Sequence, residues 1–458
     1  MLHTVSTLLI LGAGGDLASR LLLPAVGQLL TEHPDRTVHL VGAGQEEFSH
    51  DEWLERVRAS FATCDAASAG VDRLLESTRY LHVDVTKPHE LERLLAACDG
   101  APAIYFALPP QIAILVVKAL ADVSLPPHTQ LALEKPFGTD EASAKALNAL
   151  VGRLVPEEDI HRVDHFLGRS TVFNLLGLRF ANRIFEPLWN NTHIASVDIV
   201  YDEQLGLESR AGYYDHAGAL VDMIQSHLLQ VLAVVAMEPP STLDAADLRD
   251  AKGLVLRATK IWGGDPVRSS RRARYTAGSI DGVSLPAYVD ESGVDERNHT
   301  ETLAEVTVEV DTWRWAGVPF TLRSGKALGA RRREIAVTFK SASHVPRGLH
   351  GESQPTILRI LLAPDTMCLD LNLNGPGDPF ELERVSLRAD FGPGQLLAYG
   401  EVLEGILDAD PALSVRGDTA EQCWRIVAPV LAAWKADTVS LERYAAGSSG
   451  PADWKTLG

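Results

Sequence analysis

The sequence predicts two domains of different class. We expect residues 1–158 to form an α/β domain around a parallel sheet, and residues 159–458 to form a larger α+β domain with a mostly antiparallel sheet. The length of 458 residues leaves room for two or three domains at roughly 150 residues each. Short apolar runs alternate with helical stretches as far as residue 155, whereas strand-like segments follow one another later in the chain.

Short apolar runs that end at glycine or proline predict the strands of the first domain. These strands are expected at 7–11, 38–41, 80–85, 103–108 and 131–133. Helices are expected after Leu17 as far as Leu30, from Asp51 onward, and over 111–121. Apolar strands that alternate with helices are typical of a parallel sheet covered on both faces.

Longer segments predict the second domain. A long helix is expected over 213–237, and alternating strands over 302–310, 334–339, 356–362 and 367–373. The polar, arginine-rich stretch 269–282 predicts a loop, and 375–379 predicts a turn.

Composition and charge restrict the partners. Apolar residues make up 46% and charged residues 22%, as in ordinary soluble globular proteins. The net charge of −19 disfavours nucleic acid and anionic lipid, so we expect small-molecule partners and, for an anionic substrate, a local group of cations.

Cysteine spacing and the apolar pattern bear on the compartment. The four cysteines form no C-x-x-C pair, and no basic region precedes the first strand. Every unbroken apolar run is much shorter than a bilayer-spanning segment. These features predict a cytoplasmic protein.

A glycine turn follows the first strand. The residues are Gly12, Ala13, Gly14, Gly15, Asp16 and Leu17. Such a turn lets backbone N–H groups approach a pyrophosphate at a helix N-terminus, as in a Rossmann-like dinucleotide-binding domain. Leu17 stands where the third glycine is usual, so a purely structural turn is the alternative.

The residues after the second strand bear on the choice between NAD and NADP. Gln45, Glu46 and Glu47 stand there, and NADP sites usually place a cation at this point. One interpretation is that the two acids flank or cap the next helix. The other is that the site tolerates or prefers NAD.

Lys135 lies in Glu134-Lys135-Pro136-Phe137-Gly138, directly after a predicted strand. Ligands bind at that edge of open α/β sheets, so Lys135 is a candidate for bonding a substrate hydroxyl near the nicotinamide. The alternative is a lysine on a loop. A cis peptide bond at Pro136 would give a tight turn.

Histidines and cations follow in the stretch 161–169. His161 and His165 have the spacing of metal ligands, but no third ligand cluster accompanies them, so we predict no metal site. On a helix, His165 and Arg169 would share one face and could hold a phosphate. A solvated helix face is the alternative.

His227 shares an apolar stripe with Leu220, Ile224 and Val231. It is either a core histidine or, with a carboxylate partner at a cleft, a general base. A further group of cations follows in 317–333, including Lys326 and Arg331, for which an exposed basic turn is the alternative.

Taken together, these segments resemble glucose-6-phosphate 1-dehydrogenases. The matching stretches are GAGGDLA at 12–18, EKPFG at 134–138, RVDHFLGR at 162–169, LRFANRIFEPLWN at 178–190, RAGYYD at 210–215, DMIQSHLLQ at 222–230 and VPFTLRSGKAL at 318–328. They occur in the order and spacing of that family over nearly the whole chain. The DHxLG element and the histidine of HLLQ are specific, whereas the glycine turn is not.

The resemblance implies oxidation of glucose 6-phosphate at C1 with hydride transfer to NADP or NAD, in a homodimer or homotetramer. It implies that His227 is the general base and Asp164 its carboxylate partner. It implies phosphate contacts from His165, Arg169 and Arg331, and sugar contacts from Glu203, Asp222 and Lys326. Lys135 would lie between sugar and cofactor, and the cofactor would meet Gly12, Gly14, Gly15, Asp16, Leu17, Gln45 and Lys135.

The chain departs from the family pattern at several positions. Gly14 stands where Ser or Thr is frequent, Leu21 near an expected cation, and Gly44 where an arginine that contacts NADP is common. These three changes favour use of NAD. Phe166 replaces a tyrosine whose hydroxyl could reach the phosphate, and Arg169 replaces a lysine.

Three other functions are compatible with the same motifs. The first is a paralogue that oxidises another sugar phosphate, such as an amino-sugar phosphate. The second is a related dehydrogenase of unphosphorylated sugars or cyclitols, which the retention of His165, Arg169 and Arg331 disfavours. The third is a catalytically silent nucleotide-binding regulator, which the retention of Asp164 and His227 disfavours.

Overall fold

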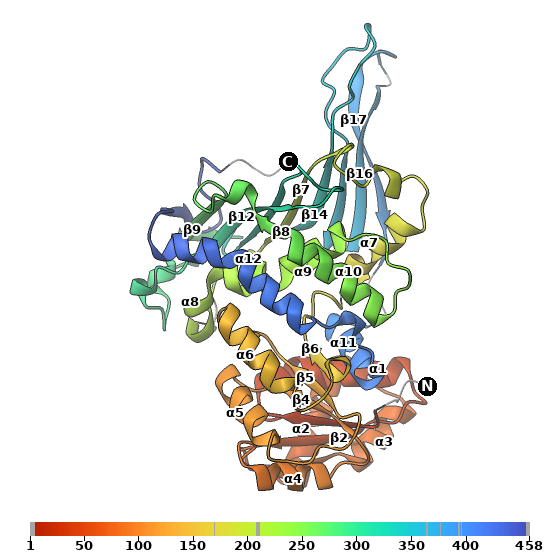
Figure 1. The fold of residues 1–458 in the computed structure, drawn as a ribbon, viewed down its shortest axis with the longest axis vertical. Helices are drawn as coiled ribbons and strands as arrows, with labels where there is room; N and C mark the ends of the chain where they lie inside the picture. The colour runs from red at the N-terminus through yellow and green to blue at the C-terminus, as the bar shows by residue number, and fades with distance from the viewer. Residues whose placement is uncertain are drawn as a thin grey trace. The chain divides into compact units, whose positions relative to one another are not determined.

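The computed structural model describes residues 5–168, 170–207, 211–362, 365–375, 377–392, 394 and 396–454. The chain divides into two compact units (Figure 1). Unit 1 comprises Met1–Arg169, Pro240–Gly253 and Gly394–Gln422, and unit 2 comprises Ser170–Pro239, Leu254–Pro393 and Cys423–Gly458. Both units therefore contain segments that are distant in sequence.

Unit 1 is built on a six-stranded parallel sheet. The strands are β1 (Thr7–Leu11), β2 (His39–Gly44), β3 (Arg79–His82), β4 (Pro102–Phe106), β5 (Gln130–Leu133) and β6 (Ile160–Arg162). Their order is β3-β2-β1-β4-β5-β6, and every adjacent pair is parallel. The predicted α/β class is confirmed.

Helices cover both faces of this sheet. They are α1 (Leu23–Glu32), α2 (His50–Ala62), α3 (Ala69–Ser77), α4 (Pro88–Ala96), α5 (Pro110–Leu120), α6 (Glu141–Val151) and α11 (Ala398–Leu407). Alternate residues of β1 enter different cores because successive side chains of a strand point to opposite faces. Leu8 and Ile10 join the core with α1, α2, α3 and α11, whereas Leu9 and Leu11 join the core with α4 and α5.

Unit 2 is built on a ten-stranded, mostly antiparallel sheet. Its strands are β7 (Ile194–Asp202), β8 (Thr259–Ile261), β9 (Ser270–Thr276), β12 (Leu303–Val310), β13 (Phe320–Gly325), β14 (Arg332–Phe339), β15 (Ile357–Leu362), β16 (Asp365–Asn374), β17 (Leu382–Asp390) and β18 (Leu441–Ala445). The main order is β17-β16-β15-β14-β7-β13-β12-β9-β18, with β8 beside β12. Only the β7–β13 and β9–β18 pairs of this described sheet are parallel. The predicted α+β class is confirmed.

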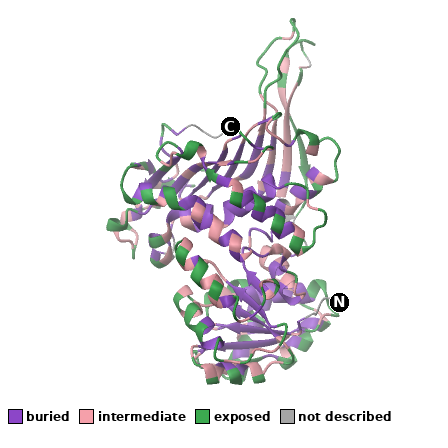
Figure 2. Ribbon diagram, in the orientation of Figure 1, coloured by how far each residue is buried: buried purple, intermediate pink, exposed green. Residues whose placement is uncertain are grey.

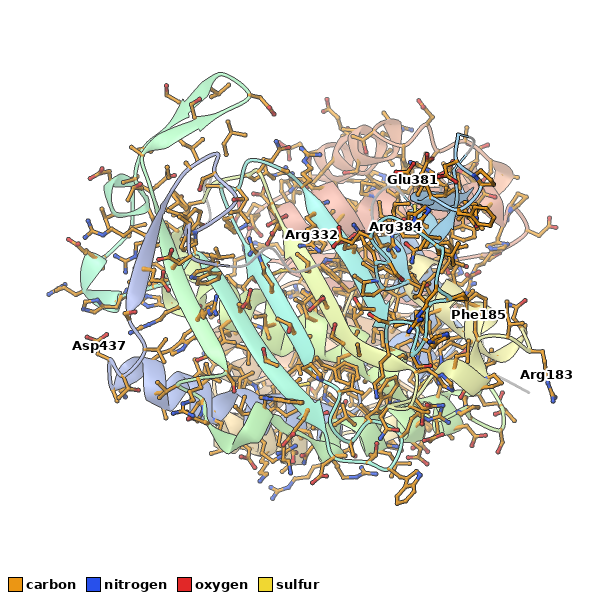
Figure 3. The ribbon with its side chains drawn as sticks, turned by 90° about the horizontal axis from the view of Figure 1, so that it is seen from above. Arg183, Phe185, Arg332, Glu381, Arg384 and Asp437 are labelled. Atoms are coloured by element: carbon orange, nitrogen blue, oxygen red, sulfur yellow. The ribbon has the colours of Figure 1, made fainter. Side chains whose placement is uncertain are left out.

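Figure 3 shows the strands of this sheet side by side, with Arg332 of β14 labelled near the middle and Asp437 at one border. The small ribbon β10 (Gly278–Ile280) and β11 (Val283–Leu285) forms a separate two-stranded sheet. The remaining named helices are α7 (Ser170–Phe180), α8 (Ala211–Ala219), α9 (Leu229–Ala236), α10 (Ala245–Ala258) and α12 (Gly417–Lys435).

The loop predicted over 269–282 is wrong, because most of this stretch forms β9 and β10. Arg272 and Arg274 within it are buried rather than solvated. Arg272 donates to the Val439 carbonyl at 2.9 Å and to Asp437 at 2.8 Å. Arg274 donates to the Thr300 carbonyl at 2.8 Å. These partners lie far away in sequence, so the local pattern does not indicate a strand.

The helix predicted over 213–237 is interrupted. Gly218 has φ 64° and ψ 178°, and the segment Leu220–Leu228 that follows it is a π-helix. The Leu229 N–H donates to the Ile224 carbonyl, five residues back, as a π-helix requires.

The whole helical path Ala211–Ala236 is long enough and apolar enough to cross a membrane by length and composition alone. Polar residues such as Asp215, Asp222 and Gln225 interrupt the path, so it contains no unbroken apolar run of that length. In the structure, 89% of the most apolar stretch of this path is buried inside the protein (Figure 2). Its apolar side chains are therefore used in the core of unit 2.

His161, one of the two histidines with metal-ligand spacing, is a core residue. It is 1% exposed. Its Nε2 lies 2.9 Å from Gln130 Oε1, and its Nδ1 lies 3.1 Å from Ser414 Oγ. Burial, with a smaller contribution from Arg249, lowers the pKa of His161 from 6.5 to about 3.

We predict that His161 makes the protein sensitive to acid. Unfolded His161 gains a proton below pH 6.5, whereas folded His161 stays neutral until about pH 3. The free energy of unfolding should therefore fall as the pH falls through this window, by up to about 1.4 kcal/mol per pH unit. Urea denaturation of the wild type and His161→Asn at several pH values measures this. Equal pH slopes for the two proteins would contradict the prediction.

Candidate functional site

Several residues predicted to carry chemistry follow strands of the parallel sheet. Gly12 follows β1, Gln45 follows β2, Lys135 comes two residues after β5, and Asp164 comes two residues after β6. Because these strands are parallel, their carboxyl ends meet at one edge of unit 1. That edge is where open α/β sheets bind ligands.

The glycine turn brings the backbone close to its neighbour strand. Gly12 has φ +83°, and a Cβ there would lie 2.3 Å from the Ala107 carbonyl oxygen. Gly15 and Asp16 are exposed, and Gln45 is exposed directly after β2. A helical turn, Ala18–Leu22, follows and continues into α1. The turn therefore fits a pyrophosphate, which needs close backbone approach and a helix N-terminus.

Leu17 explains why the third glycine of the motif is absent. Its side chain is half-buried and packs against the core formed with α1, α2 and α3. The position is therefore used for packing the first helix onto the sheet, and a glycine is not needed for close backbone approach.

The Glu46 carboxylate lies beside the glycine turn. An ideal Cβ on Gly14 would lie 2.6 Å from Glu46 Oε2, and one on Gly44 would lie 2.7 Å from the same oxygen. The Tyr80 hydroxyl donates to Glu46 Oε2 at 3.5 Å. Burial, followed by the charge of Glu46, raises the pKa of Tyr80. Neither Glu46 nor Glu47 caps α2, because Ser49 is its N-cap. Both lie just before this helix, so the flanking part of that interpretation agrees with the structure.

Arg56 of α2 is a functional candidate that was not predicted from the sequence. Its guanidinium donates to the Gly14 carbonyl and, at 3.3 Å, to the Gly15 carbonyl, and it lies over the Phe48 ring. Arg20 and Arg56 line a cavity of about 460 Å³. A cation thus reaches the turn from α2, although none follows β2 directly in sequence.

Two tyrosines hold the carboxylate that precedes Lys135. The Tyr105 hydroxyl donates to Glu134 Oε1 at 2.5 Å, and the Tyr399 hydroxyl donates to the same oxygen at 3.3 Å. Burial raises the pKa of Glu134, although both hydroxyls and Lys135 oppose this shift. The Lys135–Pro136 peptide bond is cis, as the sequence suggested.

Asp164 begins a turn rather than a helix. Its Oδ1 accepts from the Phe166 N–H at 2.9 Å, and its main-chain oxygen accepts from the Leu167 N–H at 3.0 Å. A helix at His165 was the condition for placing His165 and Arg169 on one face. That prediction is wrong, because Asp164 stabilises a turn at His165. Arg169 lies outside the described residues.

His165 stacks on Tyr399. Their ring centroids are 5.4 Å apart and the planes are inclined by 13°. The Phe166 ring lies 5.1 Å from the His165 ring. The imidazole is therefore oriented by aromatic neighbours, one of which comes from α11, near the other end of the chain.

In unit 2, Glu203 lies between two cations. Lys326 Nζ lies 2.9 Å from Glu203 Oε2, and Arg333 lies 3.2 Å from Oε1. Lys326 also lies over the Tyr214 ring at 5.2 Å, and Arg333 over the Tyr201 ring at 4.5 Å. The structure therefore brings together two predicted sugar contacts, Glu203 and Lys326.

Asp222 and His227 both lie on the π-helical segment Leu220–Leu228. Asp222 is 3% exposed and His227 is 1% exposed. The pKa of Tyr214 is raised by burial and then by the negative charge of Asp222 and of Glu301. Asp222 therefore belongs to the same neighbourhood as Tyr214, Lys326 and Glu203.

For the remaining predicted residues, the structure gives a position in the fold. Arg331 is exposed, one residue before β14. Asp164 belongs to unit 1 and His227 to unit 2, so their pairing stays a prediction. Among the described residues, no group of three or more His, Cys, Asp or Glu side chains could hold a metal ion.

Arg333, Tyr105 and Tyr399 were also not predicted from the sequence. Arg333 is part of a run of three arginines, and the alternation of side chains along a strand is the signal that could have separated it from Arg332. Tyr105 and Tyr399 carry no local signal, because only the fold brings them to Glu134.

Comparison with known proteins adds a family. Residues 9–174 match the model "Glucose-6-phosphate dehydrogenase, NAD binding domain", and residues 176–457 match "Glucose-6-phosphate dehydrogenase, C-terminal domain". The chain is 39% identical to a glucose-6-phosphate 1-dehydrogenase from Gluconobacter oxydans, over 96% of this chain and 94% of the relative. It is 37% identical to one from Rhizobium meliloti, over the same shares.

Solved structures agree with this similarity. The glucose-6-phosphate 1-dehydrogenase from Mycobacterium avium has a TM-score of 0.85 and 33% identity, covering 98% of this chain and 95% of that one. A glucose-6-phosphate dehydrogenase in complex with its substrate glucose-6-phosphate has a TM-score of 0.88 and 28% identity, covering 99% and 97%.

We predict that alanine substitutions at Gly12 and Gly14 separate folding from nucleotide binding. Gly12→Ala should lower the free energy of unfolding by about 2 kcal/mol or more, because of its positive φ and the backbone oxygen 2.3 Å away. Gly14→Ala meets only the flexible end of Glu46, so stability should change little, while nucleotide affinity falls at least about tenfold as the methyl group blocks backbone approach.

Chemical denaturation and fluorescence titration with NAD and NADP measure the two effects. Equal destabilisation by both substitutions, or unchanged nucleotide affinity in Gly14→Ala, would contradict this assignment of roles.

Proposed function

The chain belongs to the glucose-6-phosphate dehydrogenase family, and from this premise we propose that it oxidises D-glucose 6-phosphate at C1 to 6-phospho-D-glucono-1,5-lactone. The hydride passes to a nicotinamide dinucleotide, as in the first step of the oxidative pentose phosphate pathway. The observation that carries the proposal is full-length similarity to enzymes of this name, with the predicted base, carboxylate and cations retained.

The reaction breaks the C1–H bond and the O–H bond of the C1 hydroxyl. The hydrogen on C1 leaves with the bonding electron pair as hydride, and the hydroxyl loses its proton, so the C1–O single bond becomes the lactone carbonyl. We assign the hydroxyl proton to His227, with Asp164 holding the imidazole in the tautomer that accepts it. When bound, the dinucleotide supplies the ring that accepts the hydride.

The other predicted residues bind and orient the sugar phosphate. His165, Arg169 and Arg331 hold the phosphate, and Glu203, Asp222 and Lys326 contact the sugar. Lys135 lies between the sugar and the dinucleotide. Lys326 and Arg333 on either side of Glu203 support this assignment, since they fix the carboxylate in one orientation. Phosphate contacts remote from C1 hold the reacting carbon in place.

Among the cofactors, we propose that NAD is used at least as well as NADP. The dinucleotide contacts are Gly12, Gly14, Gly15, Asp16, Leu17, Gln45 and Lys135. Glu46 carries this proposal, because its carboxylate lies beside Gly14 and Gly44. A carboxylate after the second strand accepts from a ribose hydroxyl and repels a 2′-phosphate. Arg56, which donates to the Gly14 and Gly15 carbonyls, opposes this repulsion, so we expect NADP to be used as well.

We propose that the enzyme is cytoplasmic and forms a homodimer or homotetramer. Several apolar side chains on and beside β16 and β17 support the oligomer. Leu373, Phe380, Leu387 and Phe391 are each roughly half exposed. An apolar surface of this kind is typical of a protein interface.

We predict reduction of NAD and of NADP, followed at 340 nm, when purified protein is given glucose 6-phosphate. The NAD rate should be at least comparable, because Glu46 faces the glycine turn. A kcat/KM that favours NADP by more than about 100-fold, or about 2.7 kcal/mol, would refute the cofactor proposal. Turnover only with an amino-sugar phosphate would favour the paralogue instead, and nucleotide binding without turnover would favour the regulator.

We predict different kinetic defects in two variants. His227→Asn should lower kcat by about 10²–10⁴-fold, because a positioned base is lost. Arg169→Ala should mainly raise KM for the sugar phosphate, since a cation that holds the ground state is removed. Steady-state kinetics at saturating nucleotide separate the two. Similar KM defects in both variants with kcat intact would defeat the roles assigned here.

A further inference from the structure

We infer that Glu301 is a positioning residue that caps the π-helical segment Leu220–Leu228 and thereby holds Asp222 in the sugar site. This inference rests on the proposed function, because Asp222 is a sugar contact only in that proposal. Glu301 belongs to none of the motifs through which the chain resembles its family, and it lies far along the chain from the segment it caps.

The helical path needs a cap because it breaks at Gly218. With φ 64° and ψ 178°, Gly218 is outside the helical region, so a new helix starts at Ala219. The first N–H groups of any helix have no carbonyl one turn earlier to accept them. Ala219 and Leu220 are buried, so their N–H groups cannot rely on bulk water.

Glu301 accepts from both of these N–H groups. Its Oε1 accepts from the Leu220 N–H at 2.9 Å, and its main-chain oxygen accepts from the Ala219 N–H at 3.3 Å. A helix N-terminus is usually capped by the residue that precedes it. Here that residue is Gly218, which has no side chain, and a distant residue supplies the acceptor.

Gly218 and Glu301 depend on each other. An ideal Cβ on Gly218 would lie 2.3 Å from Glu301 Oε1 and 2.7 Å from Oε2. The missing side chain therefore creates the space that the carboxylate occupies. The positive φ gives a second, independent reason for glycine at this position.

The segment that carries Glu301 is held in place from both sides. The Thr300 hydroxyl donates to the Asp215 carbonyl, and Arg274 Nε donates to the Thr300 carbonyl at 2.8 Å. The Thr302 N–H donates to the Ala273 carbonyl at 2.8 Å. Glu301 is thus fixed against the large sheet just before β12, and the cap transmits that position to the helix.

The Glu301 carboxyl group is buried at this position, although burial of a carboxylate is unfavourable. Glu301 is 7% exposed, and burial raises its pKa to about 7. The Leu220 N–H, Arg272 and Arg274 favour the charged form. Negative charge at a helix N-terminus is also stabilised by the helix dipole. An apolar residue would avoid the cost of burial, so the acceptor oxygen accounts for the choice of residue.

Asp222 is the site residue most sensitive to this cap. It lies only two residues after Leu220, in the first turn of the segment, whereas His227 lies in its last part. Asp222 and Glu301 both raise the pKa of Tyr214, which places them near one hydroxyl group. Loss of the cap should therefore disturb the sugar site more than the base.

The test compares Glu301→Ala with Glu301→Gln in the full-length enzyme. Glu301→Ala should raise KM for glucose 6-phosphate at least about tenfold, with KM for the nucleotide changed less than about twofold. Glu301→Gln keeps a carbonyl oxygen that can accept from the Leu220 N–H, so KM should return to within about threefold of the wild type. If Glu301→Ala does not fold, Glu301→Asp, which withdraws the carboxylate by one methylene, is measured in its place.

Ser68→Ala is the matched control. Ser68 Oγ accepts from the Val71 N–H at the start of α3, which carries no proposed site residue. This variant loses a cap and some stability, and both KM values should stay unchanged. An equal rise of KM in Ser68→Ala, or no rescue by Glu301→Gln, would overturn the inference.

Amide hydrogen exchange separates this inference from the proposed function. Exchange at residues 219–223 should quicken in Glu301→Ala relative to the wild type, whether or not the wild type oxidises glucose 6-phosphate. Unchanged exchange there would overturn the cap even in an active enzyme. A wild type without activity but with faster exchange in the variant would overturn the function and leave the cap standing.

Discussion

Ionisable groups taken out of water must find partners inside the protein, and this constraint shapes both units. A buried carboxylate or guanidinium without a partner costs several kcal/mol. Asp202 and Arg323 pair at 3.1 Å on neighbouring strands, where burial raises the pKa of the aspartate and the arginine opposes that shift. Glu203 next to them has two cations, Lys326 and Arg333. An acidic chain can therefore hold cations in fixed places, because its carboxylates pair with them.

The same constraint decides what sequence could predict. The apolar runs 7–11 and 103–108 predicted strands, and buried strands are found at Thr7–Leu11 and Pro102–Phe106, since burial of apolar side chains needs no particular partner. The loop predicted over 269–282 is wrong at β9, because Arg272 and Arg274 are buried there through partners that are distant in the sequence. The prediction of a helix at His165 is wrong for a local reason. The Asp164 side chain accepts from the Phe166 N–H and stabilises a turn there.

The candidate site divides in a similar way. The glycine turn and Lys135 could be placed from sequence, since each follows a strand of a parallel sheet and such strands end at one edge. Tyr399 could not be placed, although it bonds Glu134 and stacks on His165, because it comes from α11 near the end of the chain. Cofactor preference is an intermediate case. The position of Glu46 after the second strand could be predicted from the sequence. The approach of Arg56 to the glycine turn from α2 could not, because it depends on how the helix packs.

The π-helical segment gives Asp222 and His227 a spatial relation that an α-helix would not. In an α-helix, with about 3.6 residues per turn, side chains five positions apart point in widely different directions. The i→i+5 hydrogen bonds of a π-helix bring such residues toward one face, and π-helical turns are frequent at functional sites. The stripe of Leu220, Ile224, His227 and Val231 assumes an α-helix and therefore groups His227 only with apolar residues. The π-helix brings Asp222 and His227 toward one face of the segment, so one short stretch of chain can carry both the proposed sugar contact and the proposed base.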